Sequence, residues 1–391
     1  MSNRGEFGDI DSGIIELAGE ARSWLFGAAN FWTEVGRSHG MFAEKLSYTG
    51  SVESCNRRTF VQGRHIYSVC MAGRLGWEGP WRSLVEETLD ILLRRARRSN
   101  GLFVHSLTCD GQIADPRVDL YDQAFMLFML AHAADVLQRN ELIDIAADLT
   151  DTLQREWQLP EGGFFEGEIT PAGIRLQNPH MHLLEAFIAL HNVSGRERFL
   201  ALAEDIVGLC ENFFVDQKSG GLLEYFDRSL CPVDGDKGSI VEPGHCFEWA
   251  WLLEKARFSS DSLHTADMLT HFGRTWGIDR SRNVAVNEVY TDGKIRNATA
   301  RLWPQTERMK VALVRYLRKS DPVEAEEVKL SYLGLRQYLN KSDGIFTWRD
   351  KLDPEGNWVK EPAPGSSLYH IVCAYNELII AANAGFVDKH L

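Results

Sequence analysis

Long hydrophobic runs are missing from this chain of 391 residues. A helix that crosses a bilayer needs roughly 18 or more consecutive apolar residues, and no stretch approaches that length. The segment 1–13 also lacks a charged region followed by an apolar one, so it does not look like a secretory signal. We therefore expect a cytoplasmic protein with no membrane partner.

Paired cysteines and excess basic charge are missing as well. The seven cysteines are an odd number and include no C-x-x-C pair, which fits reduced thiols and disfavours a disulfide scaffold or a zinc site. Acidic residues outnumber basic ones by 55 to 42, for a net charge of -13. This charge argues against nucleic acid as a partner, although local arginines can still hold a small anion.

Familiar nucleotide-binding and hydrolase motifs are also lacking. No G-x-S-x-G, P-loop or G-x-G-x-x-G sequence occurs in a suitable context. Serine hydrolases, NTPases and Rossmann oxidoreductases are therefore disfavoured. No linker rich in Pro, Gly or Ser divides the chain, so we expect one domain over residues 1–391.

What the chain does contain is a block that recurs about every 60 residues, the kind of period that marks a repeat architecture. A glycine, or in one case an asparagine, opens each block before apolar or aromatic residues. A unit of this size holds two helices and a long loop, and six such units can close into a ring with a central cavity. The blocks begin at residues 40–42, 101–103, 162–164, 220–222, 283–285 and 344–346.

Helical periodicity agrees with this all-α ring. Apolar residues recur at i, i+3 and i+4 in several segments separated by alternating short and long joins, and the long joins are expected to contain short β-hairpins. Three prolines, at positions 179, 243 and 304, stand where the first turn of a helix tolerates them. The predicted helices cover residues 84–98, 124–137, 143–157, 183–190, 199–214, 247–256, 309–318 and 323–339.

The strongest chemical signal is the pair His245 and Glu248. A separation of three residues puts both on one helix face, where a carboxylate orients an imidazole and stabilises its protonated form. Such support is typical of an acid/base histidine, while the alternative is a buried, hydrogen-bonded histidine at a helix start. His182 and Glu185 repeat the spacing one unit earlier. The order His-x-x-Glu is the reverse of the helical-bundle metal motif, so we expect no metal ion.

Other helix starts add polar and aromatic groups around the same cavity. His370, in the last unit, is a candidate second base. Arg58 opens the first inner helix, with Gln62 on the same face and Arg64 nearby, and bidentate donors stabilise negative charge that develops on an enolate oxygen. The candidates for binding a hydroxyl-rich ligand are Gln62, Arg64, Tyr121, Asp122, Asn178, Glu185, Trp303, Gln305 and Glu307.

Together these motifs resemble the N-acylglucosamine 2-epimerase family over nearly the whole chain. The resemblance implies an (α/α)6 barrel and cofactor-independent proton transfer at carbon 2 of an open-chain aldose. The motifs that carry it are Arg58-x-x-x-Gln62-x-Arg64, Asp119-Leu-Tyr-Asp122, Asn178-Pro-x-Met-His182-x-x-Glu185, Glu242-Pro-Gly-His245-x-Phe-Glu248, Arg301-x-Trp-Pro-Gln-Thr-Glu307 and Tyr369-His370.

The resemblance also implies roles for single residues. His245 and His370 would be the general acid/base pair, with Glu248 supporting His245. Arg58 would stabilise the enediolate oxygen, and His182 would bind the sugar or help to open its ring. A homodimer is expected from the resemblance alone.

Two reactions share this chemistry. Return of the proton to carbon 1 gives a ketose, and return to carbon 2 from the other face gives the 2-epimer. We favour isomerisation of unphosphorylated D-mannose to D-fructose, because the chain lacks a long insertion for a disaccharide and a Lys/Arg cluster for a sugar phosphate. A 2-epimerase of N-acylglucosamine, glucose/mannose or cellobiose stays open. An isomerase of a 6-phosphorylated or 6-sulfonated hexose also stays open, since Arg57, Arg58 and Arg64 can bind an anion.

Two other classes of protein fit the same ring. A glycoside hydrolase would place two carboxylates on either side of a glycosidic bond, and a non-catalytic sugar-binding protein would bind without turnover. The hydrolase leaves the histidines without a role. Its carboxylates would come from Asp122, Glu185, Glu248 and Glu307.

Overall fold

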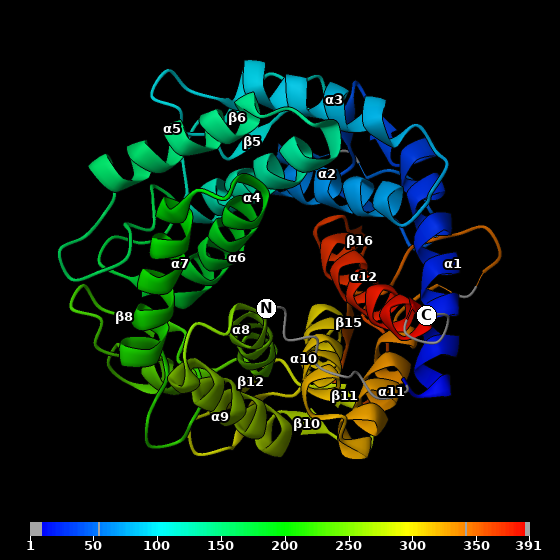
Figure 1. Ribbon diagram of the computed structural model, residues 1–391, viewed down its shortest axis with the longest axis vertical. Helices are drawn as coiled ribbons and strands as arrows, with labels where there is room; N and C mark the ends of the chain where they lie inside the picture. The colour runs from blue at the N-terminus through cyan, green and yellow to red at the C-terminus, as the bar shows by residue number, and fades with distance from the viewer. Residues whose placement is uncertain (1–9, 54, 341, 388–391) are drawn as a thin grey trace.

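The computed structural model describes residues 10–53, 55–340 and 342–387. Within these ranges the helices form two concentric rings (Figure 1), which confirms the predicted (α/α)6 barrel. No helix in these ranges is both long and apolar enough to cross a membrane. Most of the segment 1–13, on which the prediction of a cytoplasmic protein partly rests, lies outside the described residues.

The outer and inner helices alternate along the chain. The outer ring consists of α1 (Ser12–Glu34), α3 (Trp81–Ile91), α5 (Glu141–Glu156), α7 (Glu197–Leu209), α9 (Ser260–Trp276) and α11 (Pro322–Arg336). The inner ring consists of α2 (Thr59–Arg74), α4 (Leu120–Leu137), α6 (Gln177–Ser194), α8 (Pro243–Ala256), α10 (Trp303–Lys319) and α12 (Ser366–Val387). Short π-helical turns, Leu92–Ala96 and Cys210–Phe214, extend α3 and α7.

Contacts between neighbours close the inner ring. Each inner helix packs against the next, and α12 returns to pack against α2. The first and last units also meet where β3 (Lys45–Leu46) pairs antiparallel with β16 (Ala363–Pro364). The outer helix α1 packs against α12 at the same seam. Non-covalent contacts therefore join the two ends of the chain.

The position of a helix in the rings explains its sequence pattern. Outer α5 buries one stripe that includes Leu142, Ala146 and Leu149, as an amphipathic surface helix does. Inner α4 is buried nearly all round, because the outer ring covers one side and the barrel axis the other. Inner α2 buries polar as well as apolar side chains, so its apolar spacing was too weak to predict it from periodicity.

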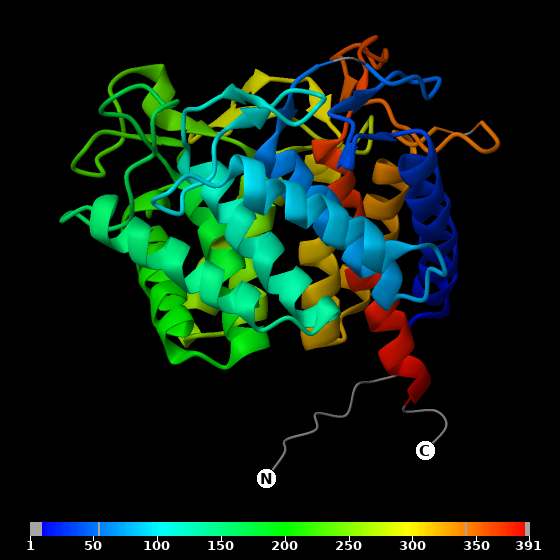
Figure 2. The same ribbon diagram turned by 90° about the horizontal axis from the view of Figure 1, so that it is seen from above.

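The long loops lie together at one end of the barrel (Figure 2), at the N-terminal ends of the inner helices. They contain the predicted hairpins as short antiparallel pairs. The strands are β1 (Arg37–Ser38), β2 (Met41–Phe42), β4 (Arg57–Arg58), β5 (Ser106–Leu107), β6 (Ile113–Asp115), β7 (Arg175–Leu176), β8 (Tyr225–Phe226), β9 (Ile240–Val241), β10 (Ile278–Asp279), β11 (Val284–Ala285), β12 (Glu288–Tyr290), β13 (Ile295–Asn297), β14 (Ala300–Arg301) and β15 (Lys351–Leu352), besides β3 and β16.

One backbone conformation explains the sequence repeat. The residue that opens each block has a positive φ angle, between 53° and 103°. Glycine adopts this left-handed region freely and asparagine tolerates it, whereas most other residues are strained there. The residues are Gly40, Gly101, Gly162, Gly220, Asn283 and Gly344.

Buried glutamines tie hairpins to inner helices. The side chain of Gln62 accepts a hydrogen bond from Phe42 N (2.9 Å) and donates to Phe42 O (3.0 Å). Gln305 makes the same two bonds to Ala285, at 2.7 and 3.0 Å. Both glutamines are 0% exposed. The backbone therefore already uses both amides, and the binding of substrate by Gln62 and Gln305 stays a prediction.

Candidate active site

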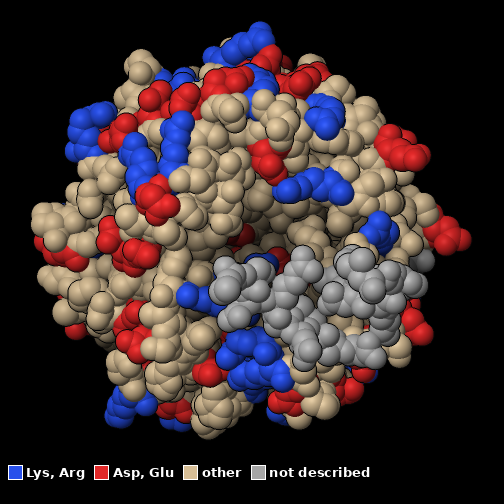
Figure 3. All heavy atoms as spheres, in the orientation of Figure 1, with Lys and Arg blue, Asp and Glu red and all other residues tan. Residues whose placement is uncertain are grey.

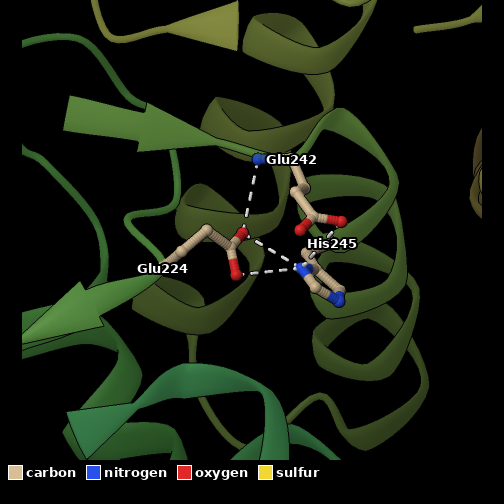
Figure 4. Close-up of side chains that lie close together, drawn as sticks. All are labelled: Glu224, Glu242 and His245. Carbon is tan, nitrogen blue, oxygen red and sulfur yellow. Dashed lines mark hydrogen bonds and ion pairs between the residues drawn. The ribbon is translucent and has the colours of Figure 1, made fainter. Parts of the chain in front are cut away.

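Two carboxylates converge on the ring of His245 in the first turn of α8 (Figure 4). The Nδ1 atom of His245 lies 3.0 Å from both carboxylate oxygens of Glu224, and 3.8 Å from Oε2 of Glu242. Gln177 Nε2 donates to Glu224 at 2.8 Å and so holds this carboxylate in place. Glu224 therefore makes the contact that orients the ring, while Glu248 acts on His245 through its charge, which also raises the pKa of the imidazole.

These neighbours favour the charged form of His245. Burial alone lowers the pKa of the imidazole, but Glu224 and Glu242 outweigh it and raise the pKa to about 9. The pKa of Glu242 is shifted as well. Burial raises it to about 7, although the charge of His245 lowers it. His245 is therefore an imidazolium at neutral pH.

His370, in the first turn of α12, stands in the opposite environment. Its Nδ1 atom lies 2.9 Å from Oε1 of Glu307. Lys310 is 0% exposed and its Nζ lies 2.5 Å from Oε2 of Glu307. Burial, together with the charges of Arg64 and Lys310, lowers the pKa of His370 well below its usual value. His370 is therefore neutral at neutral pH and can accept a proton.

Trp303, at the start of α10, brings the two histidines into one site. The centroid of its ring lies 4.8 Å from that of His245 and 5.6 Å from that of His370. Within the three described ranges, the Nε2 atom of neither histidine has a hydrogen-bond partner. One ring nitrogen of each histidine therefore remains for a ligand.

Glu248 lies close to Glu307 and His370. One oxygen of Glu248, one of Glu307 and one nitrogen of His370 all lie within 4.8 Å of one another. Burial, and then the charge of Glu307, raises the pKa of Glu248 to about 8. Such a group of ligand atoms has the composition of a metal site. However, the buried ammonium of Lys310 already supplies a positive charge beside Glu307.

The second predicted histidine–glutamate pair is confirmed. Nδ1 of His182 lies 3.4 Å from Oε2 of Glu185, and Tyr369 Oη donates to Glu185 at 2.5 Å. Burial lowers the pKa of His182 to about 4. His182 is therefore a neutral hydrogen-bonding group, with its ring against those of Tyr121 and Phe125, at 5.1 and 4.5 Å.

Two of the predicted arginines lie on this side of the inner ring. Arg58, the last residue of β4, donates from Nε to Oε1 of Glu44 at 2.5 Å, and its side chain is 36% exposed. Arg64 is buried in α2 and donates to Tyr121 Oη at 2.7 Å. The guanidinium of Arg64 lies 4.2 Å from the centroid of the Phe125 ring. Cations thus flank the site, with Arg58 the more accessible.

Two further residues that were predicted to bind substrate are Asp122 and Asn178. Asp122 is 1% exposed and its Oδ2 lies 2.8 Å from Nδ1 of His105. It therefore positions His105, and its contact with substrate stays a prediction. Oδ1 of Asn178 is buried without a hydrogen-bond partner among the described residues. Its contact with a sugar stays a prediction.

Sequence reasoning missed four residues of the site, namely Glu44, His105, Glu224 and Lys310. A positional signal existed for three of them. In each of three units, one residue forms an antiparallel β-bridge with the segment that follows the outer helix. These residues are Phe42, Phe103 and Leu222, and Glu44, His105 and Glu224 stand two positions after them. The remaining units carry a polar residue at the same place, at positions 166, 287 and 350. Lys310 had no such signal, because its spacing in α10 matches that of an exposed helix lysine.

Comparisons with known proteins agree with this geometry. The sequence pattern of the N-acylglucosamine 2-epimerase (GlcNAc 2-epimerase) family matches residues 40–374. The chain is 38% identical to a mannose-6-phosphate isomerase of Rhizobium meliloti over 377 residues, covering 92% of this chain and 96% of that protein. It is 27% identical to a D-mannose isomerase of Thermobifida fusca over 308 residues, covering 68% and 70%. The solved cellobiose 2-epimerase from Spirochaeta thermophila superposes with a TM-score of 0.85 at 19% identity, covering 95% and 98%.

Proposed function

Because the chain belongs to the N-acylglucosamine 2-epimerase family, we propose that it interconverts D-mannose and D-fructose through an enediolate. The family and the relatives make it an enzyme of the isomerase or epimerase class. The choice of isomerisation, and of a free hexose as substrate, is the proposal.

The proposal of isomerisation rests on the opposite charge states of His245 and His370. Neutral His370 takes the proton from carbon 2 of the open-chain aldose, while the imidazolium of His245 gives a proton to the oxygen on carbon 1. Removal of the proton joins carbon 1 and carbon 2 by the double bond of an enediolate, and the proton from His245 converts it to the enediol. Arg58 is the more accessible cation for the charge that develops on oxygen.

Isomerisation returns both histidines to their starting states. In the second half, protonated His370 gives its proton to carbon 1, and neutral His245 takes the proton from the oxygen on carbon 2, which becomes the carbonyl oxygen of the ketose. Epimerisation at carbon 2 by two bases on opposite faces instead leaves His370 charged and His245 neutral. The surroundings of each ring disfavour that state, since Glu224 and Glu242 flank His245 while Arg64 and Lys310 act on His370.

The test is proton NMR of the protein with D-mannose in D2O. We expect D-fructose that carries deuterium at carbon 1, because the proton removed from carbon 2 exchanges with solvent on His370. Formation of D-glucose in place of D-fructose would overturn isomerisation in favour of 2-epimerisation. Full turnover in both His245→Ala and His370→Ala would overturn the assigned roles.

A phosphorylated substrate is the second candidate, favoured by the 38% identity with the mannose-6-phosphate isomerase of R. meliloti. Arg301, the last residue of β14, is 39% exposed, and its Nε lies 3.6 Å from Oδ2 of Asp350. It is a partly exposed cation at the hairpin end. Comparison of kcat/KM for D-mannose and D-mannose 6-phosphate separates the candidates. We expect the free sugar to be preferred, and a tenfold preference for the phosphate would reverse the assignment.

A further inference from the structure

A cavity, called the rear cavity below, opens at the end of the barrel opposite to the hairpins. It has a volume of about 380 Å³ and lies among helices α2, α4, α6, α8 and α12. Figure 3 looks onto this end, where a hollow is visible at the centre of the molecule. The volume falls within the range of small-molecule sites.

Aromatic rings form much of the wall of this rear cavity. Tyr67, Phe128 and Trp251 line it, together with the amides of Asn192 and Asn376. Aromatic faces cover the C–H surfaces of a sugar, and amides bind its hydroxyls. This mixture of a few polar groups among apolar ones is typical of sites that fix the orientation of a small ligand.

Two side chains in the wall have polar atoms without partners. Both ring nitrogens of His132 and Nε1 of Trp251 are buried and make no hydrogen bond among the described residues. His132 is held in place by Tyr67 and Phe128, whose ring centroids lie 4.8 and 4.4 Å from its own. A buried donor or acceptor that is left unpaired destabilises the protein. These atoms therefore favour a partner that brings hydroxyl groups into the cavity.

The charges at this end are already paired. Arg74 lies 2.9 Å from Asp135, and Lys255 lies 3.1 Å from Glu377. The only further charged side chain in the wall described here is Glu185. No cation is left over for an anion, so the lining disfavours sugar phosphates and carboxylates.

We propose that the rear cavity binds a neutral, hydroxyl-rich small molecule, of the class of a free sugar or a sugar alcohol, at a site separate from the reacting one. This site does not depend on which reaction occurs at the other end of the barrel.

The rear cavity is physically connected to the reacting end. Glu185 lines the cavity and also contacts His182 and Tyr369. Cys373 lines it too, and its Sγ lies 3.7 Å from Nζ of Lys310, which contacts Glu307, the partner of His370. A ligand in the rear cavity therefore touches Glu185, which contacts His182 directly, and Cys373, which is linked to His370 through Lys310 and Glu307. Its binding alters turnover.

D-Mannitol is the probe for the first experiment, because it lacks a carbonyl and cannot be isomerised. Equilibrium dialysis with labelled mannitol measures its binding to the wild-type chain, to His132→Phe and to Asn376→Leu. We expect saturable binding that both substitutions weaken about tenfold or more, since each removes hydrogen-bonding atoms and keeps much of the side-chain shape. His264→Phe, the same replacement at an exposed position of α9, is the matched control and keeps wild-type affinity.

Two further measurements make the result decisive. Mannitol binding persists in His370→Ala, and mannitol changes the kcat for the sugar substrate rather than only its KM. Purely competitive inhibition, or saturable binding that neither His132→Phe nor Asn376→Leu weakens, would place mannitol elsewhere and overturn the proposal. Absence of saturable binding overturns it as well. Thermal unfolding of each variant verifies folding, and Asn376→Leu serves alone if His132→Phe does not fold.

Discussion

At the scale of the residue, His245 and His370 are the same side chain in two charge environments. Glu224 and Glu242 keep His245 protonated, whereas burial, Arg64 and Lys310 keep His370 neutral. An acid and a base are thereby present together before substrate binds. The protonated state of His245 and the neutral state of His370 lead to two predictions.

The first concerns Glu224→Gln. Loss of the carboxylate lowers the pKa of His245 from about 9, so the acid form disappears at a lower pH. We expect the alkaline limb of the kcat profile to move toward neutral pH and kcat at pH 8 to fall roughly 10- to 100-fold, within the range that general acid–base catalysis contributes. Glu166→Gln, at the equivalent position of the third unit, is the control, because burial raises the pKa of Glu166 to about 8 and glutamine resembles its neutral form. An unchanged alkaline limb in Glu224→Gln would contradict the role of Glu224.

The second concerns the pH dependence of the wild-type chain. The acid His245 is charged below about pH 9, and the base His370 stays neutral until the pH falls well below the usual pKa of histidine. We expect kcat to be flat around neutral pH and to fall as the pH rises through about 9. On the acid side we expect it to fall only well below the usual pKa of histidine, about 6.5. Initial rates in a series of overlapping buffers check this. A fall in kcat centred near pH 6.5 would mean that His370 titrates normally.

At the scale of the element, left-handed turn residues and buried glutamines attach hairpins to inner helices. Gln123 of α4 repeats the arrangement of Gln62, with bonds of 2.8 and 2.9 Å to the backbone of Phe103. The hairpin residues that precede the helices therefore have fixed positions, and so do the polar residues two positions later, Glu44, His105 and Asn287. Local sequence predicted these elements because turn geometry selects glycine or asparagine directly.

Gln123→Leu tests this attachment. The substitution leaves the N–H and C=O of Phe103 buried without their partners, at about 1–3 kcal/mol for each group. We expect the free energy of unfolding in urea to fall by about 2–5 kcal/mol, with kcat per folded molecule nearly unchanged because Gln123 lies away from the reacting groups. Gln112→Leu, at an exposed position, is the control and changes stability by less than about 0.5 kcal/mol. A loss below 1 kcal/mol in Gln123→Leu would show that the attachment adds little.

At the scale of the whole molecule, the ring is closed by contacts between its first and last units. Trp32 of α1 donates from Nε1 to Phe346 O at 3.0 Å, and its ring stacks on Trp348 with centroids 5.2 Å apart. The same seam contains the pairing of β3 with β16. Because every inner helix contacts two others, disruption of one seam affects the whole ring.

Trp32→Ala tests the seam. Trp32 is 1% exposed, and truncation of a buried tryptophan typically costs about 3–5 kcal/mol. We expect that loss in urea unfolding, with one transition that coincides for far-ultraviolet circular dichroism and tryptophan fluorescence. Trp276→Ala, at a position that is 47% exposed, serves as the control with a much smaller change. Two separate transitions in Trp32→Ala would mean that the units unfold independently.

The sequence by itself determined the repeat, the order of helices and the residue types at the helix starts. These features depend on neighbours within a few residues, since turns select glycine and helices select a period. The close approach of His182 to Glu185 was also readable, because both lie on one helix face.

Only the tertiary structure decided the partners and charges of the site. Glu224 reaches His245 from a hairpin 21 residues earlier, and Glu307 reaches His370 from a neighbouring helix 63 residues away. The structure also turned Gln62 and Gln305 toward the backbone rather than the cavity. A pKa depends on burial and on charges that are close in space, and neither is visible in a chain whose interacting residues are far apart in sequence.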